Sequence, residues 1–379
     1  MRIGIDARLY GLEHAGLGRY VMQLVENVLK LDKKNDYVLF VRSAHKDVFS
    51  GHKRVKVVEC NIPIYGLAEQ IVLPFVFAKE KLDLLHVPHF NAPLLYPHKF
   101  ILTVHDLIKH DSKGPETTTR SPMLYALKRL GYLFLTKTIA FRAAAILVPS
   151  GFVRDDLVKR LKIPAEKITV TYEATSSSLH EVALPPEQIK NILSQYGLSQ
   201  PFIVYTGSLY PHKNVDLLIE AVVKHNLRKE VDLQLALICS RSVFWERTHE
   251  KIKNRGLEDT VKMLGFLDDT NLSKIYSLAL ALVHPSKIEG FGLTGLEAMS
   301  VGLPVISSNA SCLPEVYGQA ALFFDPGSVD NLVKSLDALI RDPALREQLA
   351  ESGYRQVRKY SWKKMAKETI LVYSSIKTN

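Results

Sequence analysis

Residues 284–299, which read HPSKIEGFGLTGLEAM, have the clearest chemical potential in the sequence. An apolar run ends where this stretch starts, a glycine-rich loop follows, and a helical pattern begins near Thr294. Backbone N–H groups at a helix start, left open by glycines, form a binding site for phosphate. Glu289 and Glu297 bracket the loop, so their carboxylates can reach opposite sides of a bound diphosphate, such as a sugar and a ribose. A lone loop of this kind is as often a tight turn with a capping glutamate, and the pair of glutamates favours a ligand site.

A second glycine turn precedes Lys213. Residues 205–214 read YTGSLYPHKN, in which a strand pattern ends at Thr206, Gly207 allows a turn and Lys213 stands just before the next helical pattern. A lysine at the carboxyl edge of a parallel sheet is placed to neutralise a phosphate. For Lys213 alone, a solvated lysine at a helix start is the ordinary interpretation. Its position in the same half of the chain as the Glu289 loop favours a phosphate contact.

The first half of the chain opens a helical pattern with Gly16-Leu-Gly18-Arg. This motif matches only part of a dinucleotide fingerprint. Val21 stands at the sixth position, where a glycine is expected, and the second strand pattern ends at Arg42, where an acid would bind a ribose. We therefore interpret Gly16 and Gly18 as a turn that faces a phosphate or an acceptor, and not as an NAD site.

His105 and Asp106 end another strand pattern, TVHDL, which places them at the carboxyl edge of the predicted sheet. A lone His-Asp pair is more often structural, and the position at a strand end favours a functional role. His86 and His89 have no cysteine or carboxylate at metal-ligand spacing beside them. The sequence therefore predicts no metal site.

These residues must be positioned by strands and helices that alternate along the chain. The first half has short β-branched apolar runs at residues 2–6, 37–41, 55–59, 84–87, 100–104, 145–148 and 168–171. The second half has them at residues 202–206, 233–238, 261–264, 280–284, 304–307 and 321–323. Helical patterns fall between the runs, at residues 18–31, 189–196, 215–224, 271–277 and 294–300. Such alternation predicts an α/β fold with parallel sheets covered by helices on both faces.

The pattern breaks at the proline-containing linker Leu184-Pro185-Pro186. We therefore predict two Rossmann-like domains, residues 1–185 and 186–360, with a cleft between them where the carboxyl ends of both sheets face each other. A last helical stretch, residues 361–379, is expected to pack back across the linker.

Composition excludes several classes of protein. Apolar residues make up 47% and charged residues 23% of the 379 residues, which is typical of a globular protein and not of a disordered chain. The three cysteines form no CxxC pair, which argues against a disulfide framework or a structural zinc site and fits a reducing cytosol. The N-terminus does not read as a signal peptide. We expect a cytoplasmic protein.

The charge of +10 is uneven. Residues 1–185 contain 26 basic and 18 acidic residues, a net +8, whereas the rest of the chain has a net +2. A positive field favours an anionic partner. Basic residues interleaved with aromatics are missing, so nucleic acid is not expected. Residues 121–148 combine apolar positions with Lys128, Arg129, Lys137 and Arg142, which fits either a helix at an anionic membrane surface or a core helix with a solvated basic face.

Together, these motifs resemble the GT-B glycosyltransferases of family 4, which are retaining enzymes that use nucleotide-sugar donors. The resemblance rests on Glu289-Gly-Phe-Gly-Leu-Thr-Gly-Leu-Glu297, the turn from Gly207 to Lys213, the Gly16-Leu-Gly18-Arg motif and the His105 strand end. It covers nearly the whole chain, and the motif with two glutamates is specific.

The resemblance implies a role for each motif. Lys213 would contact the diphosphate, Glu297 the ribose and Glu289 the hexose, and His105 would approach the sugar from the first domain. The remaining donor contacts would come from Gly16, Gly18, Gly207, Ser208, Gly265, Phe266, Gly290, Phe291, Gly292, Leu293 and Thr294. Family members commonly need no metal, so no cofactor is expected. Many members have an arginine where this chain has Ser208, which leaves one fixed cation and backbone dipoles to hold the diphosphate.

The implied activity is the transfer of a hexose to a glycan or lipid-linked acceptor in the synthesis of a cell-surface polysaccharide. The His105 strand end and the Gly16 motif look most like members that act on GDP-mannose, and a UDP-sugar is the other donor considered. A peripheral position at the inner face of the membrane is left open. The alternatives are a nucleotide-sugar epimerase or a phosphorylase of similar fold, and a non-enzymatic anion-binding protein, which would leave the glutamate-bracketed loop without a role.

Overall fold

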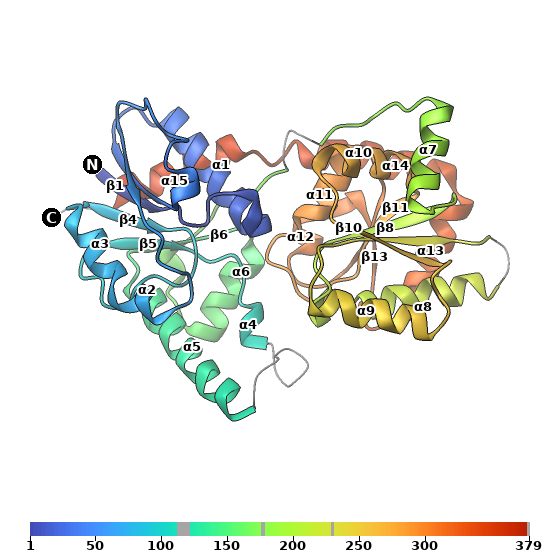
Figure 1. Cartoon of the computed structure of the whole chain (residues 1–379), viewed down its shortest axis with the longest axis horizontal. Helices are drawn as coiled ribbons and strands as arrows, with labels where there is room; N and C mark the ends of the chain where they lie inside the picture. The colour runs from blue at the N-terminus through green and yellow to red at the C-terminus, as the bar shows by residue number, and fades with distance from the viewer. Residues whose placement is uncertain (112–121, 176–178, 229–230, 377–379) are drawn as a thin grey trace. The chain divides into compact units, whose positions relative to one another are not determined.

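The computed structural model describes residues 1–111, 122–175, 179–228 and 231–376 (Figure 1). It divides into two compact units, which are described separately. Unit 1 comprises Met1–Glu173 and Ser361–Asn379, and unit 2 comprises Ala174–Tyr360.

Unit 1 contains a seven-stranded parallel sheet in the order β3-β2-β1-β4-β5-β6-β7. Its central strands are buried along their whole length, as expected for a parallel sheet covered on both faces. The strands are β1 (Arg2–Asp6), β2 (Asp36–Val41), β3 (Val55–Glu59), β4 (Leu84–Val87), β5 (Phe100–Thr103), β6 (Ala145–Val148) and β7 (Ile168–Val170).

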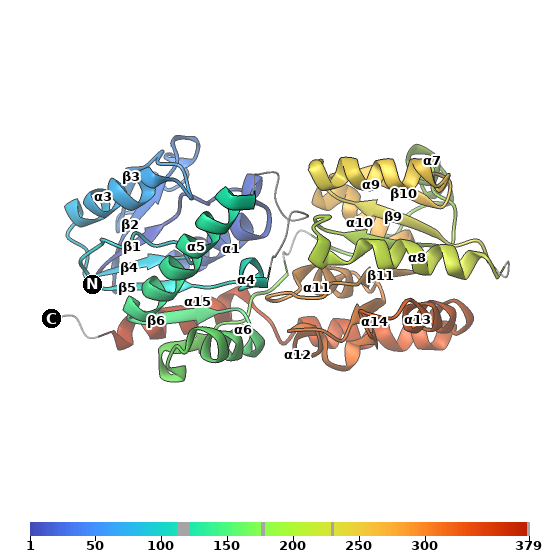
Figure 2. The same cartoon turned by 90° about the horizontal axis from the view of Figure 1, so that it is seen from below.

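Helices cover both faces of this sheet (Figures 1 and 2). One face carries α1 (Ala15–Leu31), against which α15 (Trp362–Ser375) packs. The core on the other face contains side chains of α3 and α5. The remaining helical elements of unit 1 are α2 (Leu67–Ile71), α3 (Leu73–Lys79), α4 (Ile108–Asp111), α5 (Pro122–Arg142), α6 (Gly151–Asp156), the 3-10 turns Leu12–His14, Ser43–His45 and Ala165–Lys167, and the π-turn Leu157–Leu161.

Unit 2 contains a six-stranded parallel sheet in the order β10-β9-β8-β11-β12-β13. Its strands are β8 (Phe202–Thr206), β9 (Gln234–Ile238), β10 (Val261–Gly265), β11 (Ala281–His284), β12 (Val305–Ser308) and β13 (Ala321–Phe324). Its helical elements are α7 (Pro186–Tyr196), α8 (Val215–Asn226), α9 (Val243–Asn254), α10 (Asp269–Leu278), α11 (Leu293–Ser300), α12 (Leu313–Tyr317), α13 (Val329–Arg341), α14 (Pro343–Val357) and the 3-10 turns Pro211–Lys213 and Gly318–Ala320.

Both sheets have the strand order of doubly wound α/β folds. In each sheet, the first three strands of the unit follow one another toward one edge. The next strand then pairs with the free side of the first strand, and the remaining strands follow toward the opposite edge. The crossover places the switch point between β1 and β4 in unit 1 and between β8 and β11 in unit 2. Ligands of such folds bind at the carboxyl ends of the strands that flank this point. The predicted fold of two Rossmann-like domains is confirmed, and every expected strand is present.

The division between the units differs from the predicted boundary at residue 186, because the preceding segment bonds to unit 2. Glu181 accepts a hydrogen bond from the hydroxyl of Tyr354 at 2.7 Å, and the backbone N–H of Val182 donates to Ser277 at 3.2 Å. The unit therefore begins at Ala174.

The C-terminal helix belongs to unit 1. Tyr373 of α15 is hydrogen-bonded to His86 Nδ1 at 2.7 Å, and His86 Nε2 lies 2.9 Å from the hydroxyl of Thr103. That hydroxyl also lies 3.0 Å from the hydroxyl of Tyr20 on α1. This buried chain of hydrogen bonds ties α15 and α1 to the sheet, and His86 has a structural role in it.

Helix α5 has one buried side and one exposed side, and its contact with a membrane surface stays a prediction. Its side toward the sheet buries Ile139 and Ala140, and its outer side exposes Phe134, Lys137 and Phe141. The side chains of residues 122–130 lie outside the described residues, including the predicted basic positions 128 and 129. In the part of the chain that the structure describes, no helix is long and apolar enough to cross a membrane.

Candidate functional site

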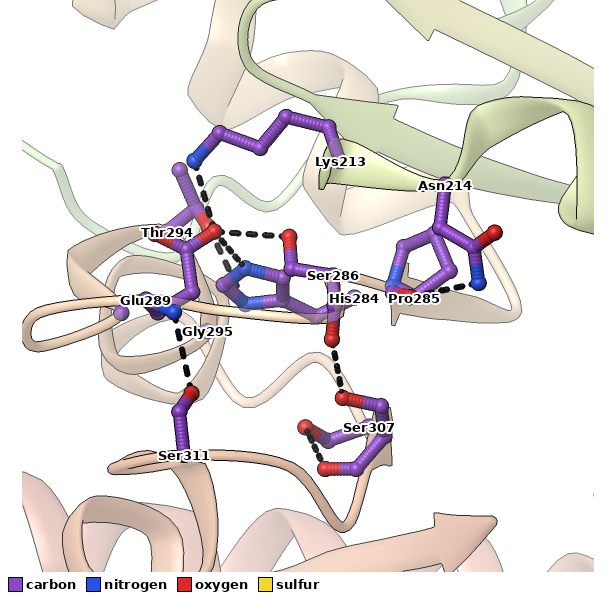
Figure 3. A network of polar contacts seen from close by, with 12 residues as sticks. Lys213, Asn214, His284, Pro285, Ser286, Glu289, Thr294, Gly295, Ser307 and Ser311 are labelled. Carbon is purple, nitrogen blue, oxygen red and sulfur yellow. Dashed lines mark hydrogen bonds and ion pairs between the residues drawn. The ribbon is translucent and has the colours of Figure 1, made fainter. Parts of the chain in front are cut away.

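Lys213 and Glu289 meet at the switch point of unit 2. Lys213 follows β8 and Glu289 follows β11, and these two strands pair with each other. The Nζ of Lys213 lies 2.6 Å from Oε1 of Glu289 (Figure 3). Asn214 fixes the turn behind the lysine, because its side-chain amide donates to the carbonyls of Pro285 at 3.1 Å and Pro326 at 2.9 Å.

Three donors converge on one oxygen of Glu289. Besides Lys213, His284 Nε2 lies 2.9 Å from Oε1, and the hydroxyl of Ser286 donates to the same atom at 2.7 Å. The backbone N–H of Glu289 donates to Ser311 at 2.9 Å. Burial raises the pKa of Glu289. The charge of Lys213 and the hydrogen bond with His284 lower it by more than burial raises it, so the net pKa lies below the usual value. Glu289 is therefore a fixed carboxylate.

Tyr317 links this carboxylate to the start of α11. Its hydroxyl lies 2.7 Å from His284 Nδ1, donates to the carbonyl of Gly292 at 2.6 Å and accepts from the N–H of Gly295 at 3.2 Å. Gly292 has φ +90, and a Cβ there would lie 2.6 Å from Leu313 and 2.7 Å from the Tyr317 hydroxyl. A Cβ at Gly295 would collide with the Tyr317 ring. Both positions require glycine, because the loop and the helix are pressed against this buried tyrosine.

The first turn of α11 has the features expected of an anion site. Gly292 occupies the N-cap position and offers no capping side chain, and the helix begins at Leu293, one residue before the predicted Thr294. The threonine hydroxyl lies 3.4 Å from His284 Nδ1. Glu297 is buried in the second turn of the helix. The helix start and Glu289 thus share His284 and Tyr317 as supports.

The other predicted donor contacts in unit 2 lie at separate places. Gly207, with φ +144, follows β8, and the backbone carbonyl of Ser208 accepts from the Tyr205 hydroxyl at 2.5 Å. Gly265 has φ +76 at the end of β10, and the next residue, Phe266, is 75% exposed. In the described part of the chain, the side-chain partners of Lys213 and Glu289 come from other positions.

Phe291 differs most from its predicted role. Gly290 and Phe291 are both buried, and the Phe291 ring packs edge-on against Tyr360 with the ring centres 5.5 Å apart. The side chain of Phe291 therefore belongs to the core, and only its backbone remains available for a ligand.

The predicted glycine turn in unit 1 is wrong in detail. Gly16 and Gly18 lie inside α1, which begins at Ala15, and the turn before the helix is made by Gly11 with φ +128. A Cβ at Gly18 would collide with the carbonyl oxygen of Gly11, whereas a Cβ at Gly16 would meet no atom within 4 Å. Gly18 is thus required for packing, and Gly16 is not.

His105 is partly buried at the carboxyl edge of the unit 1 sheet. Its Nδ1 lies 3.0 Å from Oε1 of Glu173, and its Nε2 lies 3.2 Å from the carbonyl of Pro88. Burial lowers the pKa of His105, but the hydrogen bond and charge of Glu173 raise it more, so the net pKa lies above the usual value. Its catalytic role stays a prediction, as do the other site assignments.

Sequence reasoning missed the residues that hold Glu289 in place: His284, Ser286, Ser311 and Tyr317. His284 carried a usable signal, since it ends β11 five positions before Glu289, as His105 ends a strand pattern in unit 1. Ser311 and Tyr317 come from a later crossover and had none. Among the described residues, no group of three or more His, Cys, Asp or Glu side chains could hold a metal ion.

Two protein-family models match the two halves of the chain. Residues 14–176 match the model described as Glycosyltransferase Family 4, and residues 189–356 match the model described as Glycosyl transferases group 1. Among curated proteins, the chain is 28% identical over 376 residues to the O-antigen chain mannosyltransferase B of Escherichia coli, covering 94% of this chain and 95% of that protein. It is 31% identical over 239 residues to the MMP alpha-(1->4)-mannosyltransferase of Mycolicibacterium hassiacum, covering 59% of this chain and 57% of that protein.

Solved structures of similar fold are more distant in sequence. The sucrose-phosphate synthase of Thermosynechococcus elongatus superposes with a TM-score of 0.75 at 21% identity, covering 99% of this chain and 98% of that one. Anabaena HepE, solved in complex with UDP-glucose, superposes with a TM-score of 0.74 at 20% identity, covering 99% of both chains. The two matched halves, the full-length relative and the paired Rossmann-like units together show that this chain belongs to the GT-B glycosyltransferases of family 4, with mannosyltransferases among its relatives.

Proposed function

We propose that the chain transfers mannose from GDP-mannose, with retention of anomeric configuration, to a glycan or lipid-linked acceptor in polysaccharide synthesis. The observation that carries this proposal is the contact between Lys213 and Glu289 at the switch point of unit 2. This contact accompanies the start of α11, whose N-cap residue is Gly292. The mannosyltransferase names of relatives support mannose as the sugar. The complex of Anabaena HepE with UDP-glucose makes a UDP-sugar the main competing donor.

The donor diphosphate is the natural ligand for the cation and backbone dipoles at this site. Lys213 supplies a charge on a flexible stem, and the N–H groups at Leu293 and Thr294 supply a helix start without a capping side chain. Glu297, on the next turn, binds the ribose. Because Lys213, His284 and Ser286 all contact Oε1 of Glu289, the oxygen left for a hydroxyl of the hexose is Oε2.

The reaction breaks the bond between the sugar C1 and the leaving diphosphate, on which negative charge grows. Lys213 and the α11 start stabilise this charge more in the transition state than in the ground state, which accelerates the step. Glu289 is a weak nucleophile, since three donors hold its carboxylate and its pKa is low. We therefore propose a front-face route, in which the leaving phosphate accepts the proton of the acceptor hydroxyl.

The outer face of one helical layer in unit 1 supports a lipid-linked acceptor at an anionic membrane. Exposed apolar side chains repeat every four residues along α2 and α3, at Leu67, Ile71 and Phe75. The acidic side chains of this segment point inward, since Glu69 pairs with Arg8 and Glu80 with Arg2 and Lys56. Helix α5 contains no acidic residue. An apolar face on helices that also expose Lys79 and Lys137 favours anionic lipid.

Vesicle sedimentation tests this membrane proposal. We expect the protein to sediment with vesicles that contain anionic lipid, less so in high salt, and less so after Phe75→Ser. Leu371→Ser is the matched control, because Leu371 is 68% exposed on α15, which packs on the other face of the sheet. Equal sedimentation of Phe75→Ser and the parent protein would contradict the proposal.

The donor is tested by nucleotide release from a panel of GDP-, UDP- and dTDP-sugars, with and without a mannose-containing acceptor and with and without EDTA. We expect release from GDP-mannose to exceed the others, to rise with acceptor and to persist in EDTA. Turnover of the donor to an epimer without acceptor would indicate an epimerase, and dependence on inorganic phosphate a phosphorylase. Either result would contradict the proposed transfer.

A further inference from the structure

Tyr65 in unit 1 is held in a strained conformation at the protein surface. Its φ is +65, in the left-handed region that side chains other than glycine rarely adopt, yet its side chain is 56% exposed. A residue persists in such a conformation only where its surroundings impose it, and such positions cluster at binding sites. The contacts of Tyr65 show what imposes it here.

A closed ring of hydrogen bonds fixes Tyr65 at both ends. Its backbone N–H donates to Oε2 of Glu69 at 2.8 Å, and its hydroxyl lies 3.0 Å from His89 Nε2. His89 Nδ1 lies 2.6 Å from Oδ1 of Asn91, whose amide donates back to Oε2 of Glu69 at 2.6 Å. The aromatic ring is thus oriented from its main chain and from its hydroxyl, so little conformational entropy remains to be lost on binding.

The ring of hydrogen bonds rests on a buried ion triad. One nitrogen of Arg8 donates to Oε1 of Glu69 at 2.7 Å and to Oδ2 of Asp6 at 2.7 Å, and another donates to the carbonyl of Ile62 at 3.0 Å. Asp6 is the last residue of β1. Tyr65 is therefore braced against the rigid centre of the sheet rather than against a loop.

The platform lies at the switch point of unit 1. Asp6 ends β1, and His89 follows the end of β4, the neighbouring strand. Phe90 lies beside Tyr65 with ring centres 6.0 Å apart, and Tyr132 meets Phe90 edge-on at 5.4 Å. A pocket that shares His89 and Asn91 with this platform has a volume of about 10 Å³. That is room for about one water molecule, so a ligand must lie on the aromatic rings.

The charges around Tyr65 exclude a phosphate. Two carboxylates, Asp6 and Glu69, share the single guanidinium of Arg8. Negative charge lies beside Tyr65, because Oε2 of Glu69 accepts its backbone N–H at 2.8 Å, and burial together with the charges of Glu69 and Asp106 raises the pKa of its phenol. Aromatic faces and hydrogen-bond acceptors together suit a neutral polyhydroxylated ligand, whose C–H face stacks and whose hydroxyls donate.

We propose that Tyr65 and Phe90 form a stacking platform for a neutral sugar ring of the acceptor glycan, with Glu69, His89 and Asn91 as positioning residues. This assignment rests on the proposed function and names the part of unit 1 that binds the acceptor. It separates the molecule's two ligand chemistries: the charged diphosphate at the switch point of unit 2, and an uncharged saccharide at that of unit 1.

Direct binding tests the platform without any donor. A ligand-observed NMR titration with a methyl glycoside of α-linked mannobiose is carried out on the parent chain, Tyr65→Gly and Tyr65→Phe. Glycine relieves the backbone strain and removes the ring, so we expect about tenfold weaker binding. Phenylalanine keeps the ring and should stay within about threefold of the parent. In transfer assays, Tyr65→Gly should raise KM for the acceptor while KM for the donor is unchanged.

Lys162→Gly is the matched control, since Lys162 is an exposed residue of unit 1 with φ 59. It should leave mannobioside binding unchanged, and mannose 6-phosphate should bind more weakly than the neutral sugar. Equal binding by Tyr65→Gly and the parent, or tighter binding of the phosphorylated sugar, would overturn the platform. Saccharide binding through Tyr65 without nucleotide release from any donor would support the platform and contradict the proposed function, so the two failures are distinguishable.

Discussion

The two sheets carry different chemistry at the same architectural position. In unit 2, the switch point between β8 and β11 holds Lys213 against Glu289, next to a helix start bounded by glycines. In unit 1, the switch point between β1 and β4 holds Arg8 between two carboxylates, with an exposed aromatic ring above them. In the first arrangement a partly exposed lysine is paired with one carboxylate beside a helix start, whereas in the second a buried arginine is shared by two carboxylates.

The comparison shows that strand order determines where a ligand can bind, and the local balance of charge determines which ligand fits. Both sheets are parallel and doubly wound, and both place a histidine and a carboxylate together near the carboxyl edge: His284 with Glu289, and His105 with Glu173. The pKa of Glu289 is lowered, while that of His105 is raised. Each of the following predictions tests one side of this contrast.

The largest expected effect follows from Lys213→Ala. Loss of the one side-chain cation at the unit 2 site removes a charge-stabilising contact, so kcat for nucleotide release should fall on the order of 10²-fold. It also leaves the buried carboxylate of Glu289 without its cation, so the melting temperature should drop. Lys287→Ala is the control, because Lys287 is exposed only two residues before Glu289. Unchanged turnover in Lys213→Ala would remove this lysine from the reaction.

A pair of glycine substitutions compares a helix position packed against Tyr317 with an open helix position. Gly295→Ala should cost about 1–3 kcal/mol of unfolding free energy, because its Cβ would collide with the buried Tyr317 ring. Gly131→Ala in α5 of unit 1 meets no atom within 4 Å and should stabilise by about 0.5–1 kcal/mol, since alanine is the better helix former. Denaturant unfolding measures both. The same sign for both variants would contradict the packing assigned to Tyr317.

Ser208→Arg sharpens the contrast in charge. Ser208 is exposed after β8, in the same turn as Lys213, so an arginine there adds a second cation to the donor side. We expect KM for the donor to fall by about threefold to tenfold at low salt, with the gain reduced at high salt because the charge is exposed. A matched arginine outside the site, Ser199→Arg, should leave KM unchanged. No change in Ser208→Arg would show that the diphosphate lies elsewhere.

The smallest effects concern pH, and they have opposite signs in the two units. The folded pKa of Glu289 lies below the ordinary 4.5, so its contribution to stability is present above pH 4.5 and is lost as pH falls. The folded pKa of His105 lies above the ordinary 6.5, so its contribution is present below pH 6.5 and is lost as pH rises. Glu289→Gln should therefore reduce the loss of stability of unit 2 in acid, and Glu173→Gln should reduce the loss in unit 1 above pH 6.5.

The two tryptophans allow each unit to be followed separately. Trp245 belongs to unit 2 and Trp362 to unit 1, and the chain has no others. In the Trp245→Phe variant the remaining tryptophan reports on unit 1, and in the Trp362→Phe variant it reports on unit 2. Unfolding of both variants is followed by fluorescence across pH 4 to 9. If only Trp362 reported a loss of stability at low pH, the assignment of the Glu289 contribution to unit 2 would be contradicted.

The alternation of apolar runs and helical patterns was enough to predict both sheets, because a strand buried on both faces leaves an unmistakable apolar run. It also predicted Lys213 and Glu289, since short turns after strands carry site residues with recognisable types. The glycine motif in α1 was misread as a turn, because sequence shows that Gly18 lacks a side chain but not that the carbonyl of Gly11 lies against it.

By itself, the sequence determined the elements and their assembly into parallel sheets, and it singled out Lys213 and Glu289 as candidates for a ligand site, since these depend on local periodicity and on residue type. Only the tertiary structure decided that Tyr317 and Ser311 support the Glu289 loop and that Glu69, His89 and Asn91 hold Tyr65. These contacts join segments from different crossovers, and their distances follow from how helices pack on a sheet. No local pattern in the chain encodes such a distance.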